Sequence, residues 1–200
     1  MGTGDRNRYL DQVLIGGRER RAIVIVEYDP AWPPRFDEER QRISAALGGT
    51  ARVIEHIGST SVPGLAAKPV IDILVPVDDV EDEAAYLPAL EDAGYLLRVR
   101  EPGHRMFRTP ELDVHVHLWR AGSEDVDRHV LFRDWLRVDE RDRGEYERLK
   151  RLLAQRDFDH TNEYADAKGD LIGEIMARAR EWESERGPTA GPQGGGFAGS

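Results

Sequence analysis

A single carboxylate stands inside an otherwise apolar segment of the chain. Asp72 lies within PVIDILVPV (residues 69–77), and in an extended strand its neighbours Ile71 and Ile73 point to the opposite face. A lone carboxylate in such a strand is unfavourable unless it is paired, hydrogen-bonded or bound to a metal ion. Asp72 is therefore a candidate catalytic metal ligand. The alternative is an acid at a strand end that meets solvent or a structural arginine.

Two histidines alternate with apolar residues in LDVHVHLW (residues 112–119). This spacing places Asp113, His115 and His117 on one face of a strand. Imidazoles in such an arrangement bind a metal, move a proton or contact a phosphate. An HxH pair also occurs on polar sheet faces that bind nothing, so the pattern alone leaves both interpretations open.

A short polar loop, GSTS (residues 58–61), precedes the strand of Asp72. Gly58 lets the backbone approach a ligand closely. The loop also carries three hydroxyl side chains that add hydrogen-bonding groups: Ser59, Thr60 and Ser61. Exposed amides at the start of a following helix would favour a phosphate. The alternative is an ordinary polar turn, closed by Pro63 and Gly64.

Cationic side chains near these segments are further candidates for ligand binding. Lys68 could neutralise a phosphate as a mobile point charge, or it could be a surface lysine. Arg105 is the first residue of RMFRT (residues 105–109), another segment expected to be a strand. Tyr164 and Lys168, four positions apart on one expected helix, share a face and could reach over a cleft. The alternative for this pair is a tyrosine that packs on the lysine stem.

Strands and helices must position these candidates. Six segments rich in apolar residues are expected to be strands: 22–28, 52–57, 69–77, 95–100, 105–109 and 112–119. Two segments between them are expected to be helical, 35–47 and 80–94, and helical periodicity dominates from Glu124 onward. The pattern predicts an α+β (α/β-like) fold, in which a mixed β-sheet core is flanked by helices and followed by a C-terminal helical region.

The length of 200 residues suits a single domain, which we place at residues 21–184. Residues 1–20 are expected to be a flexible tail, and the Gly/Pro-rich residues 185–200 a disordered one. The chain has no cysteine, which excludes disulfides and thiolate metal sites. A polar start and the lack of a long apolar run predict a cytoplasmic protein that does not enter a membrane.

The formal net charge of −10 argues against a broad electrostatic contact with duplex nucleic acid. A single nucleotide needs only a few well-placed donors, so a small anionic ligand remains compatible with this charge.

The segment EHIGSTSVPGLAAKPVIDILV (residues 55–75) resembles the signature of the GrpB family, whose members are similar in fold to the nucleotidyltransferase superfamily. Further segments resemble the family in the same order: VEYDPAWPPRF, HVHLW, HVLFRDWLR, EYERLKRLLA and EYADAKGDLIGEI. The resemblance spans roughly residues 22–183. Related domains are joined to dephospho-CoA kinase in some bacteria, an association that points to nucleotide metabolism.

The resemblance implies that Gly58 and Ser59 position nucleotide phosphates, while acids hold divalent ions that polarise the α-phosphate and activate an acceptor hydroxyl. Asp72 matches the first of these acids, but Leu74 stands where the second is expected. Asp113 matches the local pattern of the third. The expected cofactor is a divalent ion, Mg²⁺ or Mn²⁺, and the expected substrate is a nucleoside triphosphate.

Two functions are compatible with these residues. The first is a nucleotidyltransferase-like enzyme that moves a nucleoside monophosphate to an unidentified small molecule or protein. In that case Asp113, His115 or His117 would complete the metal site or act as base, and Lys68 or Arg105 would support the phosphates. The second is a non-catalytic module that binds a nucleotide or another phosphate ligand. Leu74 favours the second function.

Overall fold

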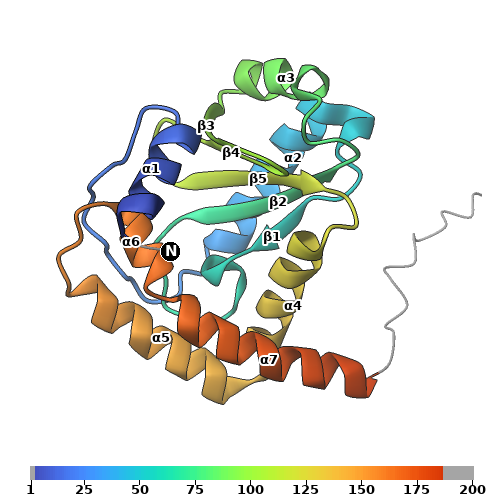
Figure 1. The fold of residues 1–200 in the computed structure, drawn as a ribbon. Coiled ribbons are helices and arrows are strands. Elements are labelled where there is room, and N and C mark those ends of the chain that lie inside the picture. Colours follow the sequence, from blue (N-terminus) through green and yellow to red (C-terminus); the bar gives the residue numbers. More distant parts are fainter. Residues whose placement is uncertain (1–2, 187–200) are drawn as a thin grey trace, which may run out of the picture.

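One five-stranded sheet forms the centre of the molecule (Figure 1). The computed structural model describes residues 3–186. The strand order is β1-β2-β5-β4-β3, with β2 and β5 parallel and the other neighbours antiparallel. The strands are β1 (Glu55–Ile57), β2 (Ile71–Val77), β3 (Leu96–Glu101), β4 (His104–Arg108) and β5 (Val114–Arg120). This mixed sheet with flanking helices confirms the predicted α+β fold.

Helices cover both faces of the sheet (Figure 1). They are α1 (Thr3–Val13), α2 (Trp32–Leu47), α3 (Leu87–Asp92), α4 (Glu124–Val138), α5 (Glu140–Ala154), α6 (Thr161–Asp166) and α7 (Gly169–Arg186). Short 3₁₀ turns are η1 (Gly48–Thr50), η2 (Ser59–Ser61) and η3 (Glu83–Ala85). None of the helices in residues 3–186 combines the length and apolar character of a bilayer-spanning segment.

The alternation of side chains along β2 and β5 separates an apolar face from a face that carries the candidate site residues. Ile71, Ile73 and Val116 belong to the main core, which also includes residues of α2 and α3. Successive side chains of a strand point to opposite faces. Asp72 and the histidines of β5 therefore lie on the other face, toward the C-terminal helices.

The N-terminal segment corrects the prediction of a flexible tail over residues 1–20. Residues 3–13 form α1, and Leu10, Val13 and Leu14 form a small buried cluster against Val99 of β3. Arg98 of β3 also donates hydrogen bonds to backbone carbonyls of the segment that follows α1. At the other end α7 continues to Arg186, and residues 187–200 lie outside the described part of the chain.

The expected strand at residues 22–28 is absent as a regular element. Only Val26 pairs in an extended fashion, with Ala67, through two backbone hydrogen bonds of 2.9 Å. The side chain of Val24 is exposed. Val26 and Tyr28 pack against the main core, so the segment is apolar without being a member of the sheet.

Candidate functional site

Three side chains that can ligate a metal meet where β2 and β5 run in parallel; we call Asp72, His115 and His117 the His–Asp cluster. The strand register pairs Asp72 with His115 and Leu74 with His117. Asp72 Oδ1 lies 3.2 Å from His115 Nδ1 and 3.7 Å from His117 Nε2. One potential ligand atom from each of the three lies within 4.8 Å of the others. Within residues 3–186 it is the only such group of three.

The protonation states in this cluster suit metal binding. Burial opposes ionisation of Asp72, but hydrogen bonds with His115 and His117 hold the pKa of its carboxyl well below the ordinary value. Burial lowers the pKa of His117, against the opposing effect of Asp72. The cluster therefore presents an ionised carboxylate and a neutral imidazole, which are the forms that coordinate a metal ion.

The donor set also indicates which ions fit. Two imidazole nitrogens and one carboxylate oxygen suit a divalent transition metal, whereas Mg²⁺ prefers oxygen ligands in octahedral geometry. Leu74 is fully buried among Ile57, Trp119 and residues of α4. The position expected for a second acid thus forms part of an apolar cluster, and the described residues offer ligands for one ion.

Gly58 brings the backbone of the polar loop directly against Asp72. Its φ of +69° and ψ of −174° belong to a region of backbone space that is open almost only to glycine. A Cβ added here would lie 2.5 Å from Asp72 Oδ2. No side chain larger than hydrogen fits between the loop and the carboxylate, so a glycine is required.

A cavity of about 390 Å³ opens over the His–Asp cluster; we call it the cluster cavity. Besides the cluster, five residues expected at the site line it: Gly58, Ser59, Lys68, Tyr164 and Lys168. The structure thus gathers eight predicted residues around one space, from the loop between β1 and β2, from β2 and β5, and from the C-terminal helical region. Tyr164 and Lys168 lie on α6 and just before α7, with Lys168 Nζ 4.6 Å from the centre of the Tyr164 ring.

Thr60 and Ser61 hold the loop together and do not line the cluster cavity, which corrects their expected role as ligand-binding residues. The Thr60 hydroxyl donates to the backbone carbonyl of Val70 at 3.0 Å. The Ser61 hydroxyl donates to the carbonyl of Gly58 at 2.6 Å. Both side chains are buried, so their hydroxyls satisfy backbone groups inside the turn.

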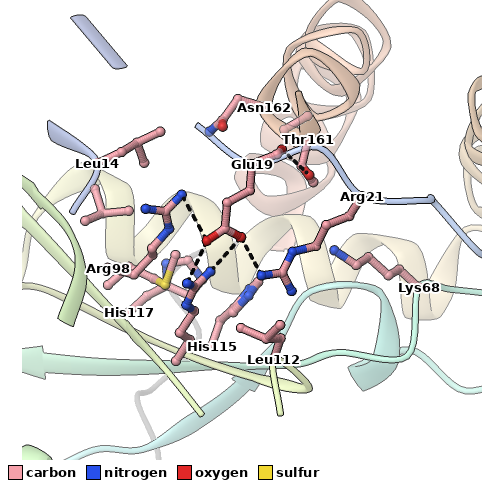
Figure 2. A pocket seen from close by; sticks show the side chains of 14 residues that line it. Leu14, Glu19, Arg21, Lys68, Arg98, Leu112, His115, His117, Thr161 and Asn162 are labelled. Atoms are coloured by element: carbon pink, nitrogen blue, oxygen red, sulfur yellow. Dashed lines mark hydrogen bonds and ion pairs between the residues drawn. The ribbon is translucent and has the colours of Figure 1, made fainter. Parts of the chain in front are cut away.

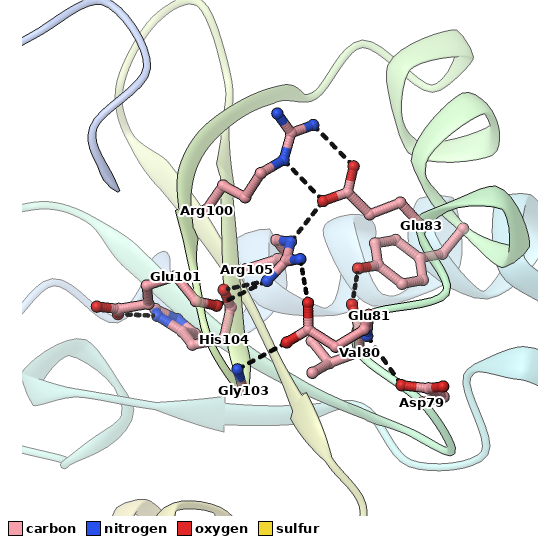
Figure 3. Close-up of polar contacts among 10 residues, drawn as sticks. Asp79, Val80, Glu81, Glu83, Arg100, Glu101, Gly103, His104 and Arg105 are labelled. Atoms are coloured by element: carbon pink, nitrogen blue, oxygen red, sulfur yellow. Dashed lines mark hydrogen bonds and ion pairs between the residues drawn. The ribbon is translucent and has the colours of Figure 1, made fainter. Parts of the chain in front are cut away.

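Arg105 has a structural role, which corrects its expected support of a phosphate (Figure 3). Its register partner is Leu118, so its side chain lies on the face of the sheet opposite the His–Asp cluster. Its guanidinium donates to Glu83 and Glu81, at 2.6 Å each, and to two backbone carbonyls of the β3–β4 hairpin. The side chain is buried and its donors are used within the protein.

Asp113 is also excluded from the His–Asp cluster, which corrects its expected role as a metal ligand. β5 begins only at Val114, so the strand alternation does not extend to Asp113. Its carboxylate accepts hydrogen bonds from Arg35 at 2.6 Å and from Thr109 at 2.7 Å. Burial raises the pKa of Asp113, but these two partners bring it below the ordinary value.

A chain of polar groups behind His117 was missed from the sequence. Glu101 lies 2.7 Å from His104 Nδ1, and His104 Nε2 lies 3.2 Å from His117 Nδ1. Such outer hydrogen bonds orient a metal-binding imidazole and fix which nitrogen is free. Nε2 of His117, which faces Asp72, is thereby left able to coordinate a metal ion. The pairing of β4 with β5 places His104 opposite Trp119, which lies on the same face of β5 as His117. The sequence alone does not show this pairing.

His129 and Lys150 line the cluster cavity as well, and neither was expected there. Burial lowers the pKa of His129 to about 4, with His117 adding to the effect. They come from α4 and α5, whose approach to the sheet depends on tertiary packing.

A second cavity of about 300 Å³, which we call the arginine cavity, adjoins the first and shares Lys68, His115 and His117 with it (Figure 2). Its wall contains a carboxylate surrounded by three arginines: Glu19, with Arg21, Arg98 and Arg108. Hydrogen bonds from Arg108 are the main cause that lowers the pKa of Glu19 to about 2. The arginines of this wall are therefore partly neutralised within the protein.

Stability is expected to depend on pH through Lys150. Burial, together with the nearby charge of Lys168, lowers the pKa of this amine to about 7, while Glu147 opposes the shift. An unfolded lysine titrates near 10.4, so between these values the unfolded chain binds more protons and the contribution to stability rises with pH. Relative to Lys150→Met, the wild type should gain about 2 kcal/mol in free energy of unfolding from about pH 7 to about pH 9. Urea denaturation of both proteins across this range measures the difference, and parallel pH profiles would contradict the expectation.

Comparison with known proteins places this geometry in a family. A family model described as "GrpB protein" matches residues 22–178. The chain is 52% identical over 166 residues to a UPF0157 protein of Streptomyces coelicolor, covering 83% of this chain and 89% of that protein. It is 48% identical over 175 residues to a UPF0157 protein of Halalkalibacterium halodurans, covering 85% and 90%.

A solved structure and a group of larger enzymes are similar as well. The crystal structure of the conserved protein GrpB from Enterococcus faecalis matches with a TM-score of 0.71 and 36% identity, covering 80% of this chain and 100% of that chain. Dephospho-CoA kinase of Mycolicibacterium paratuberculosis is 27% identical over 197 residues, which cover 84% of this chain but only 48% of that protein.

Proposed function

The chain belongs to the GrpB family, and from this membership and the cluster cavity we propose that it is a metal-dependent nucleotidyltransferase-like enzyme. It would move a nucleoside monophosphate from a nucleoside triphosphate to a small molecule or a protein. The observation that carries the proposal is the direct contact between the loop at Gly58 and the carboxylate of Asp72, which lies in a three-residue metal-ligand set. A phosphate cradle and a metal site would thus adjoin in one cavity.

The His–Asp cluster would hold one divalent ion, and its donor set favours Mn²⁺ or another transition metal over Mg²⁺. When bound, such an ion supplies positive charge that polarises a phosphate and lowers the pKa of an acceptor hydroxyl. Ser59 and the adjoining backbone amides would donate hydrogen bonds to phosphate oxygens. The chain of Glu101 and His104 would keep His117 in a single orientation while a nucleotide binds.

The similarity to one half of dephospho-CoA kinases supports a nucleotide-related substrate. The similarity reflects two domains joined in one chain and does not by itself identify the reaction.

A second candidate function is a nucleotide- or phosphate-binding module without catalysis. The specific observation in its favour is Leu74, which is fully buried at the position where a second acid would help to hold a second ion. In a two-ion site the ions stabilise both the attacking and the leaving oxygen of a displacement. A site with one ion can stabilise only one of these oxygens.

Incubation with labelled nucleoside triphosphates, Mn²⁺ and cell extract separates the two functions. Transfer of label by the wild type is expected to be lost in Asp72→Asn and retained in Asp113→Asn, a matched carboxylate that is paired with Arg35 outside the cluster. Nucleotide-dependent thermal stabilisation without transfer would favour the binding module, since a ligand at 100 times its dissociation constant adds about 2.7 kcal/mol. If every nucleotide gives neither result, both functions are wrong.

A further inference from the structure

Every lysine of the chain lines the cluster cavity. The sequence has 28 basic residues, and only three of them are lysine: Lys68, Lys150 and Lys168. They come from the loop before β2, from α5 and from the junction between α6 and α7. Arginine supplies every other cation of the protein. An ammonium is a compact point charge that can lose its proton when buried, which a guanidinium cannot do.

The three ammonium groups have no carboxylate partner among the described residues. Lys150 Nζ donates to the backbone carbonyl of Ala66 and lies 4.9 Å from the centre of the Tyr146 ring. Lys168 lies over the ring of Tyr164. Burial lowers the pKa of both Lys68 and Lys150, and the charge of Lys168 lowers each further. Three amines therefore share one cavity without a salt bridge to any described carboxylate, although Asp72 lines the same cavity and acts on Lys68.

A hydroxyl in the same cavity lacks a partner too. Tyr164 is 5% exposed and lines the cavity, yet its hydroxyl forms no hydrogen bond within residues 3–186. Buried hydroxyl groups are nearly always hydrogen-bonded, so an unsatisfied one in a cavity lined by three lysines indicates a missing acceptor. An oxygen-rich anion would satisfy the hydroxyl and the ammonium groups together.

We propose that Lys68, Lys150, Lys168 and the Tyr164 hydroxyl bind the β- and γ-phosphates of the nucleotide and the pyrophosphate that leaves. This assignment rests on the proposed function for the identity of the ligand. The cluster cavity has a volume of about 390 Å³, within the usual range for small-molecule sites. The α-phosphate would then lie toward Gly58 and the His–Asp cluster, and the lysines would bind the β- and γ-phosphates.

Calorimetric titration with inorganic tripolyphosphate in metal-depleted buffer tests the lysines without the metal ion. Lys68→Met, Lys150→Met and Lys168→Met should each weaken binding roughly tenfold or more, because each removes a charge-assisted hydrogen bond. Tyr164→Phe should weaken it a few fold. Arg52→Met removes a cation that is exposed and does not line the cavity, and it should leave the affinity unchanged. The net charge of −10 opposes non-specific binding of a polyanion.

Proton uptake gives a readout that a structural role of Lys150 would not alter. The groups that act on this amine are Lys168, Glu147 and Arg151, and it is largely neutral at pH 8. A bound polyanion raises the pKa of a neighbouring amine, so the wild type should take up protons on binding at pH 8. Titrations in buffers of different ionisation enthalpy should show this uptake in the wild type and less of it in Lys150→Met. Circular dichroism establishes that each variant is folded.

Failure of this inference is distinguishable from failure of the proposed function. Absence of tripolyphosphate binding by the wild type, or lysine variants that bind within twofold of it, would overturn the inference even if Asp72-dependent transfer occurs. Lysine-dependent binding without any transfer of label would support the phosphate site and contradict the enzymatic function.

Discussion

Replacing Asp72 with alanine is expected to weaken the binding of Mn²⁺ at least about 100-fold, because the variant loses the only anionic member of the His–Asp cluster. His115 and His117 would remain, but two neutral imidazoles offer no charge to balance the ion. Burial opposes ionisation of Asp72, but hydrogen bonds with His115 and His117 hold the pKa of its carboxyl well below the ordinary value, so the wild-type carboxylate is ionised at neutral pH.

Electron paramagnetic resonance measures this directly, since the signal of free Mn²⁺ decreases as the ion binds. Asp113→Ala is the matched control, because Asp113 lies just before the same strand but binds Arg35 and Thr109. Its affinity for Mn²⁺ should equal that of the wild type. Equal affinity in Asp72→Ala would place any bound ion elsewhere.

Gly58→Ala is expected to lower the free energy of unfolding by about 3 kcal/mol. The backbone at Gly58 adopts a conformation nearly exclusive to glycine, which alone costs roughly 1–3 kcal/mol for another residue. The new Cβ would also lie 2.5 Å from Asp72 Oδ2 and 3.0 Å from Asp72 Cβ, so the loop or the strand must move. Urea denaturation measures the loss, and the displaced carboxylate should weaken Mn²⁺ binding as well.

Gly64→Ala separates backbone strain from this contact. Gly64 has a φ of +78°, but an added Cβ there would meet nothing within 4 Å. This variant should therefore lose only about 1–2 kcal/mol and keep the wild-type affinity for Mn²⁺. If both glycine variants lose the same stability and both retain the ion, the close approach of Gly58 to Asp72 has no functional consequence.

The period of two in a strand made part of the site predictable. It placed His115 and His117 on one face of β5, and it separated Asp72 from Ile71 and Ile73. The sequence does not show that β2 and β5 are parallel neighbours, since β3 and β4 lie between them in the chain. That pairing, which sets Asp72 beside His115, is a tertiary outcome.

Other residues were placed wrongly or missed because their positions depend on tertiary contacts. Arg105 is two residues from Phe107 on β4, and both face the core helices. Only the strand register reveals this. Lys150 reaches the cavity because α5 packs on the loop before β2, through Tyr146 and Leu65. Leu10 and Val13 of α1, with Leu14 directly after it, are enough to pack a short and strongly charged helix against β3, although its composition is typical of a tail.

The most direct measurement is the anomalous scattering of crystals grown with Mn²⁺ and recorded near the manganese absorption edge. A single peak within coordinating distance of Asp72, His115 and His117 is the predicted result. A peak that contacts none of these three residues, or a pair of ions sharing Asp72, would contradict a one-ion site in the His–Asp cluster.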